Sequence, residues 1–313
     1  MTTAFLFPGQ GAQVVGMGAD VASAYPAAAG IFEKANDVLG FDLRKVCFEG
    51  PAETLNTTTM SQPAIFTTSA ALLEVIRTEP AMSGLVPQIT AGLSMGEYTA
   101  LYAAGLISFE DGLRLVHKRG EAMQAAADAT RGAMVSVMGL DEEKVRVLCR
   151  EAAQGDLLEP VNFNCPGQIV VSGTVASCER VMELAPQHGA LKAIRLEVAG
   201  AFHTAMMAGA ADALRRALSA CQIGEPGEIK TLANIDAEYY PSAASIVEGL
   251  ARQLTSPILW ARCMQRLLAE GVDELFEIGP NRVLTGLMKR IDRKAKVVNL
   301  STADSIEALL KGV

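Results

Sequence analysis

The sequence G-L-S-M-G at residues 92–96 decides the fold of this chain, because it lies between an apolar run at 85–91 and a helix-like stretch at 97–104. Its two glycines permit a tight turn from strand to helix, which a side chain at either position would block. Such a turn exposes the hydroxyl of Ser94 at a helix N-terminus, where unpaired backbone amides carry partial positive charge. The stretch therefore predicts an α/β fold in which a serine is posed to attack a carbonyl carbon and nearby amides stabilise the oxyanion.

The composition limits the class of protein. The chain has 313 residues, of which 50% are hydrophobic and 20% charged. A chain of this size buries a large core and has room for about two domains. No apolar run reaches the length of a membrane span, and residues 1–7 lack the basic and apolar regions of a secretory signal. Because the formal net charge is −8, nucleic acid is excluded as the main partner. We therefore expect a cytoplasmic protein with no nucleic-acid or membrane partner.

The cysteines and a cluster of cations indicate less about function than the stretch around Ser94 does. Six cysteines are widely spaced and form no C-x-x-C pair, which favours reduced thiols over a disulfide framework or a metal site. The cation cluster has two interpretations: a solvated helix end that complements the helix dipole, or a docking surface for an acidic partner. It consists of Lys289, Arg290, Arg293, Lys294 and Lys296.

The order of predicted elements divides the chain into two domains. From residue 132 the pattern is β-α-β-β-α-β, with strands at 133–138, 159–163, 168–172 and 191–198 and helices at 141–153 and 175–185. That order is typical of a small ferredoxin-like domain. We assign residues 129–198 to it and residues 1–128 and 199–313 to a large α/β-hydrolase-like domain with a parallel sheet. The large domain is predicted to have strands at 5–7, 229–234 and 274–278 and helices at 18–39, 61–79, 109–126, 244–254 and 258–270.

A serine nucleophile needs a base, and histidine is the usual one because its pKa lies near neutrality. The chain has three histidines. His188 lies in a predicted surface turn, and His117 lies on a helix among basic residues, where a solvated face accounts for it. His203 follows an apolar loop at the junction where the chain returns to the large domain. It is the candidate base, although a buried structural histidine is the alternative.

Seven motifs occur in one order across nearly the whole chain, and together they closely resemble the malonyl-CoA:acyl carrier protein transacylase family. This is the acyltransferase family of type II fatty-acid synthesis and is related to polyketide-synthase acyltransferase domains. The motifs are F-P-G-Q-G-A-Q at 7–13, G-L-S-M-G-E-Y at 92–98, V-H-K-R-G at 116–120, V-N-F-N-C-P-G-Q at 161–168, G-A-F-H at 200–203, R-Q-L-T-S-P at 252–257 and E-I-G-P at 277–280.

The resemblance implies a role for each matching residue. Ser94 is the acylated nucleophile and His203 the general base, held by the backbone carbonyl of Gln253 in a Ser-His dyad. The oxyanion hole consists of the backbone amides of Gln10 and Met95. The substrate-binding residues are Arg119, which pairs with the malonyl carboxylate, Gln253, Asn162, which faces the cleft together with Asn164, and Phe202, which crowds an α-methyl group.

Arg119 also has a physical argument of its own. A guanidinium binds a carboxylate through two parallel hydrogen bonds, and the pair is strong where water is excluded. An acetyl group leaves the guanidinium unpaired, which discriminates against it. Without the resemblance, a cation on a surface helix is the simpler interpretation of H-K-R-G at 117–120.

One residue departs from the family pattern. The family commonly has histidine directly before the nucleophile, and this chain has Leu93. The neighbour is not the base, so the departure affects only a polar contact near the carboxylate. Met95 replaces the more usual leucine, which does not affect a role carried by a backbone amide.

The resemblance implies an [acyl-carrier-protein] S-malonyltransferase with a ping-pong mechanism. Its partners are malonyl-CoA and acyl carrier protein, both substrates, and no bound cofactor or metal is needed. We expect a monomer. Three alternatives stay open: a trans-acting polyketide acyltransferase with the same chemistry, a serine esterase or thioesterase of the α/β-hydrolase type, and a carrier-protein binding module with an inactive site.

Overall fold

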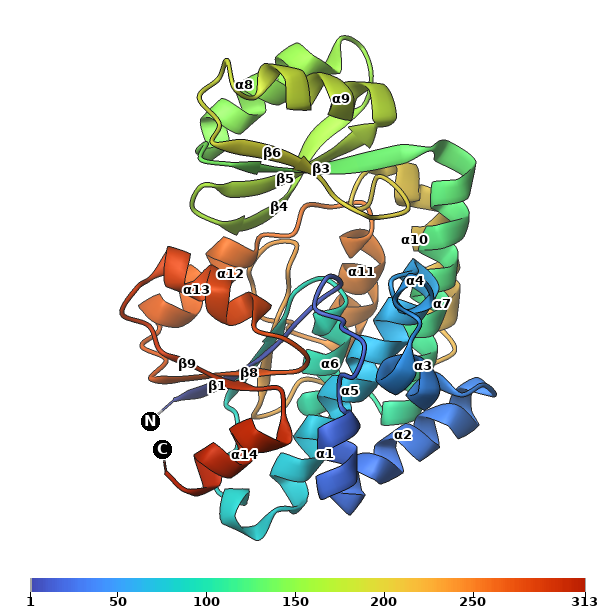
Figure 1. Ribbon diagram of the computed structural model, residues 1–313, viewed down its shortest axis with the longest axis vertical. Coiled ribbons are helices and arrows are strands. Elements are labelled where there is room, and N and C mark those ends of the chain that lie inside the picture. Colours follow the sequence, from blue (N-terminus) through green and yellow to red (C-terminus); the bar gives the residue numbers. More distant parts are fainter. Residues whose placement is uncertain (1, 313) are drawn as a thin grey trace.

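The computed structural model describes residues 2–312 and contains two sheets, one at the centre of the molecule and one at its end (Figure 1). The central sheet has five parallel strands in the order β7-β2-β1-β8-β9. Its strands are β1 (Thr3–Phe7), β2 (Ile89–Gly92), β7 (Lys230–Leu232), β8 (Glu274–Ile278) and β9 (Val297–Leu300).

Helices cover both faces of the parallel sheet, so its central strand, β1, is buried throughout. Successive side chains of a strand point to opposite faces. Phe5 and Phe7 accordingly pack into the larger core and Ala4 and Leu6 into a second core behind the sheet. The helices of the larger core are α1 (Ala19–Ala24), α2 (Pro26–Leu39), α3 (Leu43–Glu49), α4 (Ala52–Leu55), α5 (Thr58–Thr78), α6 (Gly96–Ala103), α7 (Phe109–Thr130), α10 (Ala208–Leu218), α11 (Ala243–Gln253) and α14 (Ala303–Leu310). The second core is closed by α12 (Trp260–Ala269) and α13 (Val283–Ile291). Two short 3-10 turns lie at Pro80–Met82 and Ala205–Met207.

The second sheet is antiparallel, with strand order β4-β5-β3-β6, and forms a separate unit at one end of the molecule (Figure 1). Its two helices lie together on the outer face of the sheet, over a third apolar core. The elements are β3 (Gly132–Met138), α8 (Glu142–Ala153), β4 (Leu158–Cys165), β5 (Gln168–Thr174), α9 (Val175–Leu184) and β6 (Lys192–Arg195).

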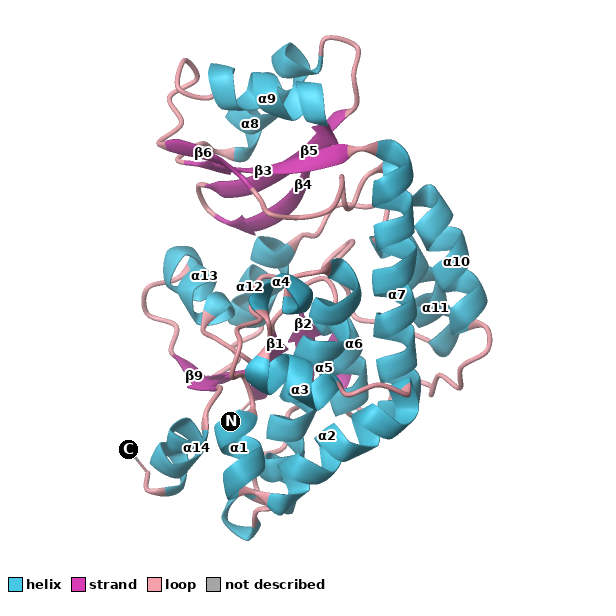
Figure 2. Cartoon of the chain, turned by 45° about the vertical axis from the view of Figure 1, so that its right-hand side comes forward, coloured by secondary structure: helices cyan, strands magenta, loops and turns pink. Residues whose placement is uncertain are grey.

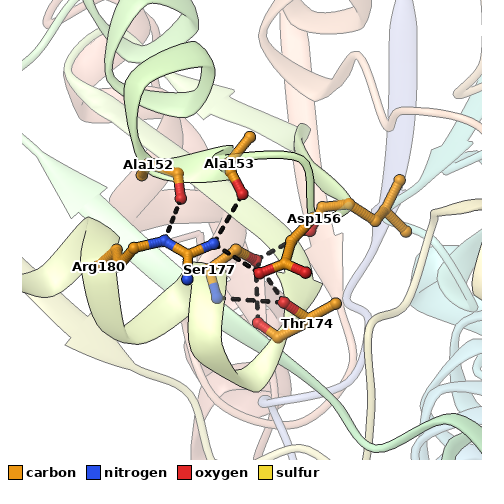
Figure 3. A network of polar contacts seen from close by, with 7 residues as sticks. Ala152, Ala153, Asp156, Thr174, Ser177 and Arg180 are labelled. Carbon is orange, nitrogen blue, oxygen red and sulfur yellow. Dashed lines mark hydrogen bonds and ion pairs between the residues drawn. The ribbon is translucent and has the colours of Figure 1, made fainter.

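A polar network joins α9 to the end of α8 and to the turn that follows it (Figure 3). Arg180 of α9 donates to the carbonyls of Ala152 and Ala153, which lie in the last turn of α8, over 2.5 and 2.7 Å. It also binds the carboxylate of Asp156 at 2.6 Å. Because Ser177 donates to the carbonyl of Leu157 from the same helix, α9 holds the whole α8–β4 turn.

The antiparallel unit is fixed to the rest of the chain at two places. β3 continues directly from the end of α7, as Figure 2 shows. On the other side, Ile258 donates to the carbonyl of Val161 and accepts from the amide of Phe163, over 2.7 and 2.9 Å. Arg290, one of the five clustered cations, donates to the side chain of Gln168 and the carbonyl of Gly167 in the β4–β5 turn. The cluster is therefore not simply a solvated helix end, because Arg290 links α13 to the antiparallel unit.

Most predicted elements are confirmed, and the differences have local causes. The predicted order of strands and helices in 132–195 is correct, and Asp141 caps α8 by accepting from the amide of Lys144. The helix predicted at 109–126 continues to Thr130, because alanine favours helix. The strand predicted at 191–198 ends at Arg195, and residues 196–198 turn away to line a cavity.

Helices α3, α4 and α14 were missed because short segments carry little periodicity. All six cysteines are free thiols. Between residues 2 and 312, none of the helices combines the length and hydropathy needed to cross a bilayer.

Candidate active site

The turn around Ser94 is held by close backbone contacts at both glycines. A Cβ at Gly92 would lie 2.0 Å from the carbonyl of Gly96, and a Cβ at Gly96 would lie 2.3 Å from the carbonyl of Phe7. Neither glycine has a positive φ; the residue in the left-handed region is Ser94 itself, with φ 50°. The glycines therefore provide room for β1 and β2 to meet the start of α6, and Ser94 carries the strain that is typical of a nucleophile turn.

The N-terminal loop packs against this turn. A Cβ at Gly9 would lie 2.3 Å from the carbonyl of Leu93, so only glycine lets the loop after β1 approach so closely. Gln10, the next residue, lines the same cavity as Ser94. Within residues 2–312 the amides of Gln10 and Met95 donate to no internal acceptor, which leaves both free for a ligand oxygen.

Ser94 and His203 form a hydrogen-bonded pair. The Oγ of Ser94 lies 3.0 Å from Nε2 of His203, and Nδ1 of His203 lies 2.8 Å from the backbone carbonyl of Gln253. A carbonyl only accepts, so Nδ1 carries the proton and Nε2 of the neutral ring accepts from the serine. Burial and, to a smaller extent, the charge of Arg119 lower the pKa of His203 to about 3, against the opposing effect of the Gln253 carbonyl. The imidazole is therefore neutral at physiological pH, as a general base must be.

The carbonyl of Gln253 occupies the place that an acid takes in a hydrolase triad. Across the described residues, neither nitrogen of His203 binds an aspartate or glutamate. The α/β-hydrolase alternative expects such an acid. At this site the backbone carbonyl of Gln253 is the group bound to Nδ1 of the imidazole that lies beside Ser94.

Arg119 places a buried cation beside the nucleophile. It is 1% exposed, and its Nη2 lies 3.0 Å from both the Oγ of Ser94 and Oε1 of Gln253. Its Nη1 donates to Oε1 of Gln62 over 2.8 Å. In the described part of the chain no carboxylate oxygen lies within 4.0 Å of it, so the charge is surrounded by neutral acceptors only. Burial lowers the pKa of Arg119. The site is therefore suited to a ligand that brings its own carboxylate.

The position of Arg119 follows from the glycine that comes next in the sequence. A Cβ at Gly120 would lie 2.7 Å from the carbonyl of Thr58 at the start of α5. The absent side chain lets α7 pack directly against the backbone of α5, which brings Arg119 to Gln62. The alternative interpretation of Arg119 as a cation on a surface helix is therefore wrong, because the side chain is buried.

The nucleophile opens into a cavity of about 400 Å³ between the two sheets. The residues that line it are Gln10, Gly11, Gln13, Asn56, Ser94, Arg119, Met123, Met134, Asn162, Leu196, Glu197, Val198, Phe202 and His203. Most of the predicted site residues thus meet in one place, at the carboxyl ends of the parallel strands, where open α/β sheets bind ligands.

Three predicted residues lie outside the cavity wall. Met95 has a fully buried side chain, and Gln253 lies behind Arg119 and His203. Asn164 is buried without reaching the cavity, whereas Asn162 lines it and its Oδ1 has no hydrogen-bond partner. Leu93 packs into the apolar core behind the sheet, so the departure from the family pattern does not alter the cavity wall.

Sequence reasoning missed a second group of buried polar residues behind the nucleophile. Asn234, which follows β7, accepts from the amide of Ser94 over 2.7 Å. Glu97 accepts from the amide of Asn234, from Nε2 of Gln253 and from the hydroxyl of Tyr240. Burial raises the pKa of Glu97 to about 7 against these hydrogen bonds. The signal for Glu97 was its place in the first turn after the nucleophile, where helix dipoles favour acids.

The other two histidines lie away from Ser94. His117 pairs with Glu121 at 3.5 Å and contacts the ring of Phe41, so it is half-buried rather than fully solvated. His188 lies in a turn and pairs with Glu151 at 2.9 Å. Of the three histidines, His203 is the one beside the serine.

Comparison with known proteins gives one consistent result. The acyl transferase domain family matches residues 4–308. The chain is 43% identical over 309 residues to the malonyl CoA-acyl carrier protein transacylase of Bacillus subtilis (strain 168), covering 98% of this chain and 96% of that one. It is 42% identical over 288 residues to the protein of the same name from Escherichia coli (strain K12), covering 92% of each.

Solved structures agree in fold. The malonyl CoA-acyl carrier protein transacylase of Coxiella burnetii superposes with a TM-score of 0.95 at 35% identity, over 99% of this chain and 97% of that one. A malonyl-transacylase in complex with its holo type II PKS acyl-carrier protein superposes with a TM-score of 0.95 at 39% identity, over 100% of both chains. The chain therefore belongs to the acyl transferase domain family, alongside relatives that carry the name malonyl CoA-acyl carrier protein transacylase.

Proposed function

We propose that this protein transfers a malonyl group from malonyl-CoA to the phosphopantetheine thiol of acyl carrier protein. The observation that carries the proposal is the buried guanidinium of Arg119, 3.0 Å from the Oγ of Ser94 and without a carboxylate partner among residues 2–312. A malonyl thioester brings a carboxylate for Arg119 and a carbonyl for Ser94 in one molecule.

The first half-reaction acylates Ser94. Its Oγ attacks the thioester carbonyl while Nε2 of His203 takes the hydroxyl proton. The oxyanion is stabilised by the amides of Gln10 and Met95 until the carbon–sulfur bond breaks. CoA leaves after receiving the proton from His203, and a malonyl ester remains on Ser94.

The second half-reaction reverses these roles. The thiol of the carrier protein gives its proton to His203, and its sulfur attacks the ester carbonyl. The amides of Gln10 and Met95 again hold the oxyanion, and the loss of one such donor typically costs about 3–4 kcal/mol. Ser94 leaves with the proton of His203. The reaction is of the ping-pong type and needs no cofactor, because the thioester supplies the driving force.

The remaining substrate contacts come from the cavity wall. Asn162 contributes its side chain to the cavity wall on the side of the antiparallel sheet, and Phe202 crowds an α-methyl group beside His203. Gln253 keeps the base oriented through its carbonyl.

The three proposed site residues Ser94, His203 and Arg119 all lie in the larger of two proposed domains. We assign residues 1–128 and 199–313 to an α/β-hydrolase-like domain that carries Ser94, His203 and Arg119. Residues 129–198 form a ferredoxin-like domain, for which the β-α-β-β-α-β order and the antiparallel strand order argue. We place the enzyme in the cytoplasm as a monomer.

A second candidate is the same transfer in polyketide synthesis. It is favoured by the likeness to the malonyl-transacylase solved with a type II PKS acyl-carrier protein. The two candidates differ in the carrier protein that accepts the malonyl group, not in the residues of the site.

Mass spectrometry of the intact protein tests the proposal. Malonyl-CoA should add one malonyl group to Ser94, and carrier protein with its phosphopantetheine arm should remove it. Acetyl-CoA and methylmalonyl-CoA should react far more slowly. No adduct with any of the three would overturn the proposal, and steady release of free malonate without carrier protein would favour a thioesterase.

A further inference from the structure

Gln253 is the residue on which the base, the cation and the nucleophile converge. Its backbone carbonyl accepts from His203, and its side-chain oxygen accepts from Arg119 over 3.0 Å. Its side-chain nitrogen donates over 3.0 Å to the carbonyl of Ser94 and to Oε2 of Glu97. These contacts work in only one orientation of the amide, since an inverted amide would point NH₂ at the guanidinium and oxygen at two acceptors.

Glu97 fixes this orientation of the Gln253 amide, because its carboxylate accepts from the side-chain nitrogen. Its carboxylate is 1% exposed and does not line the cavity. It accepts over 2.9 Å from the amide of Asn234 and over 3.0 Å from Gln253, both on Oε2, while Tyr240 donates to Oε1. All three donors lie on other elements, so the carboxylate is fixed independently of the residue that it orients.

We propose that Glu97 is a positioning residue for the acyl transfer: it holds the amide of Gln253 so that this residue aims His203 and Arg119 at Ser94. Glu97 touches none of the reacting atoms and acts through the side chain of Gln253. This inference rests on the proposed function for the identity of the acyl group, but not for the alignment of Ser94 with its base.

The test therefore measures alignment without malonyl-CoA. A fluorophosphonate reacts with an activated serine by forming a phosphorus–oxygen bond, releasing fluoride and passing the serine proton to the base. The rate at which the fluorophosphonate labels Ser94 reports how well Ser94 and His203 are aligned. Malonyl transfer is followed in parallel, so that labelling without a malonyl adduct would reject the proposed function while the labelling rates still decide the role of Glu97.

The variant Glu97→Leu removes the acceptor and keeps a side chain of similar size. Labelling should fall about 10- to 100-fold, because small displacements of catalytic groups have effects of that size. Glu97→Gln keeps one acceptor oxygen and should restore labelling to within about threefold.

Coupling to Gln253 separates a positioning role from a structural one. In a Gln253→Ala background, which retains the backbone carbonyl for His203, Glu97→Leu should change labelling by less than about twofold. Equal slowing in both backgrounds, or no slowing in the wild-type background, would overturn the proposal.

Glu277 provides a matched control, because it is another fully buried carboxylate and accepts from the amides of Leu284 and Thr285 away from the site. Glu277→Leu should lower Tm without slowing labelling. Slowing equal to that of Glu97→Leu would reject the inference.

If Glu97→Leu does not fold, Tyr240→Phe decides, because it removes one donor to Glu97 and keeps the ring. A loss of about threefold that disappears with Gln253→Ala supports the inference. An unchanged rate rejects it.

Discussion

The Nη2 of Arg119 lies 3.0 Å from the Oγ of Ser94, so the serine hydroxyl accepts a hydrogen bond from a buried cation. The same oxygen lies 3.0 Å from Nε2 of His203. A charge buried this far from solvent raises the free energy of the folded protein unless it is paired. A carboxylate that enters the cavity can pair with Arg119 and release the serine lone pair for attack.

Arg119→Ala should therefore change selectivity as well as rate. We expect malonyl transfer to fall by about 10²–10⁴, because the carboxylate of the substrate loses its buried partner. Acetyl transfer should fall less or rise, since the acetyl group never used the guanidinium. The initial rates of Ser94 acylation by the two CoA esters, followed by mass spectrometry, measure the ratio.

Arg114 is the matched control for that experiment. It lies on the same helix, but its side chain is 55% exposed and pairs with Asp111 at 3.5 Å. Arg114→Ala should leave both rates as they are. An unchanged malonyl-to-acetyl ratio in Arg119→Ala would remove Arg119 from the acyl site.

The glycines of the nucleophile turn should be sensitive to a single methyl group. A Cβ at Gly96 would meet the carbonyl of Phe7 at 2.3 Å, and backbone cannot move aside as a flexible side chain can. We expect Gly96→Ala to destabilise the fold by about 1–3 kcal/mol and to slow acylation of Ser94. Urea unfolding and the acylation rate test this.

Gly30 is the control glycine, because it lies in α2 with nothing within 4 Å of its Cβ position. Gly30→Ala should keep full activity and raise stability by up to about 1 kcal/mol, since alanine restricts the unfolded chain. Equal losses in the two variants would contradict a special role for Gly96.

The strand, turn and helix around Ser94 were predictable because each leaves a local sequence signal. An apolar run, two glycines and a helical period lie within twenty residues. The pairing of Ser94 with His203 joins residues 109 positions apart, which no periodicity specifies. Comparison of the three histidines made His203 the candidate base, and the resemblance to a family then assigned it that role.

The burial of Arg119 and the role of Glu97 were not predictable in the same way. Arg119 lies in a sequence of charged residues, and only the close contact of Gly120 with Thr58 turns it inward. Glu97 resembles any acid in a first helical turn. Its three donors are Asn234 after β7, Gln253 at the end of α11 and Tyr240 between them, so its burial exists only after the whole domain has folded.

Phe202 should set the size limit for the α-carbon of the acyl group. Its ring is 4% exposed, lines the cavity and precedes the base His203. Phe202→Ala should raise the ratio of methylmalonyl to malonyl acylation about tenfold or more, because a methyl-sized clash is worth about 1–3 kcal/mol. Competition between the two CoA esters, read as two masses on Ser94, gives the ratio directly.

Met134 is the control for cavity volume. It lines the same cavity from β3 and is 3% exposed. Met134→Ala enlarges the cavity on the antiparallel side and should leave the acyl ratio near that of the wild type. A larger shift in Met134→Ala than in Phe202→Ala would show that the limit lies on that side.

His203 should make stability depend on pH in a defined window. Its pKa is lowered from the ordinary histidine value of 6.5 to about 3 in the fold, so between these values the unfolded chain binds a proton that the folded chain rejects. The contribution of His203 to the free energy of unfolding therefore falls as pH decreases from 6.5, by up to about 1.4 kcal/mol per pH unit, and is constant above 6.5.

The comparison variant is His203→Asn, because asparagine tolerates the positive φ of 63° at this position. The difference in unfolding free energy between wild type and His203→Asn, from urea titrations at several pH values, should grow with pH up to about 6.5 and then level off. The opposite titration of Glu97 occurs in both proteins and cancels in this difference, so parallel stability curves would mean that the pKa of His203 is the same in the folded and the unfolded chain.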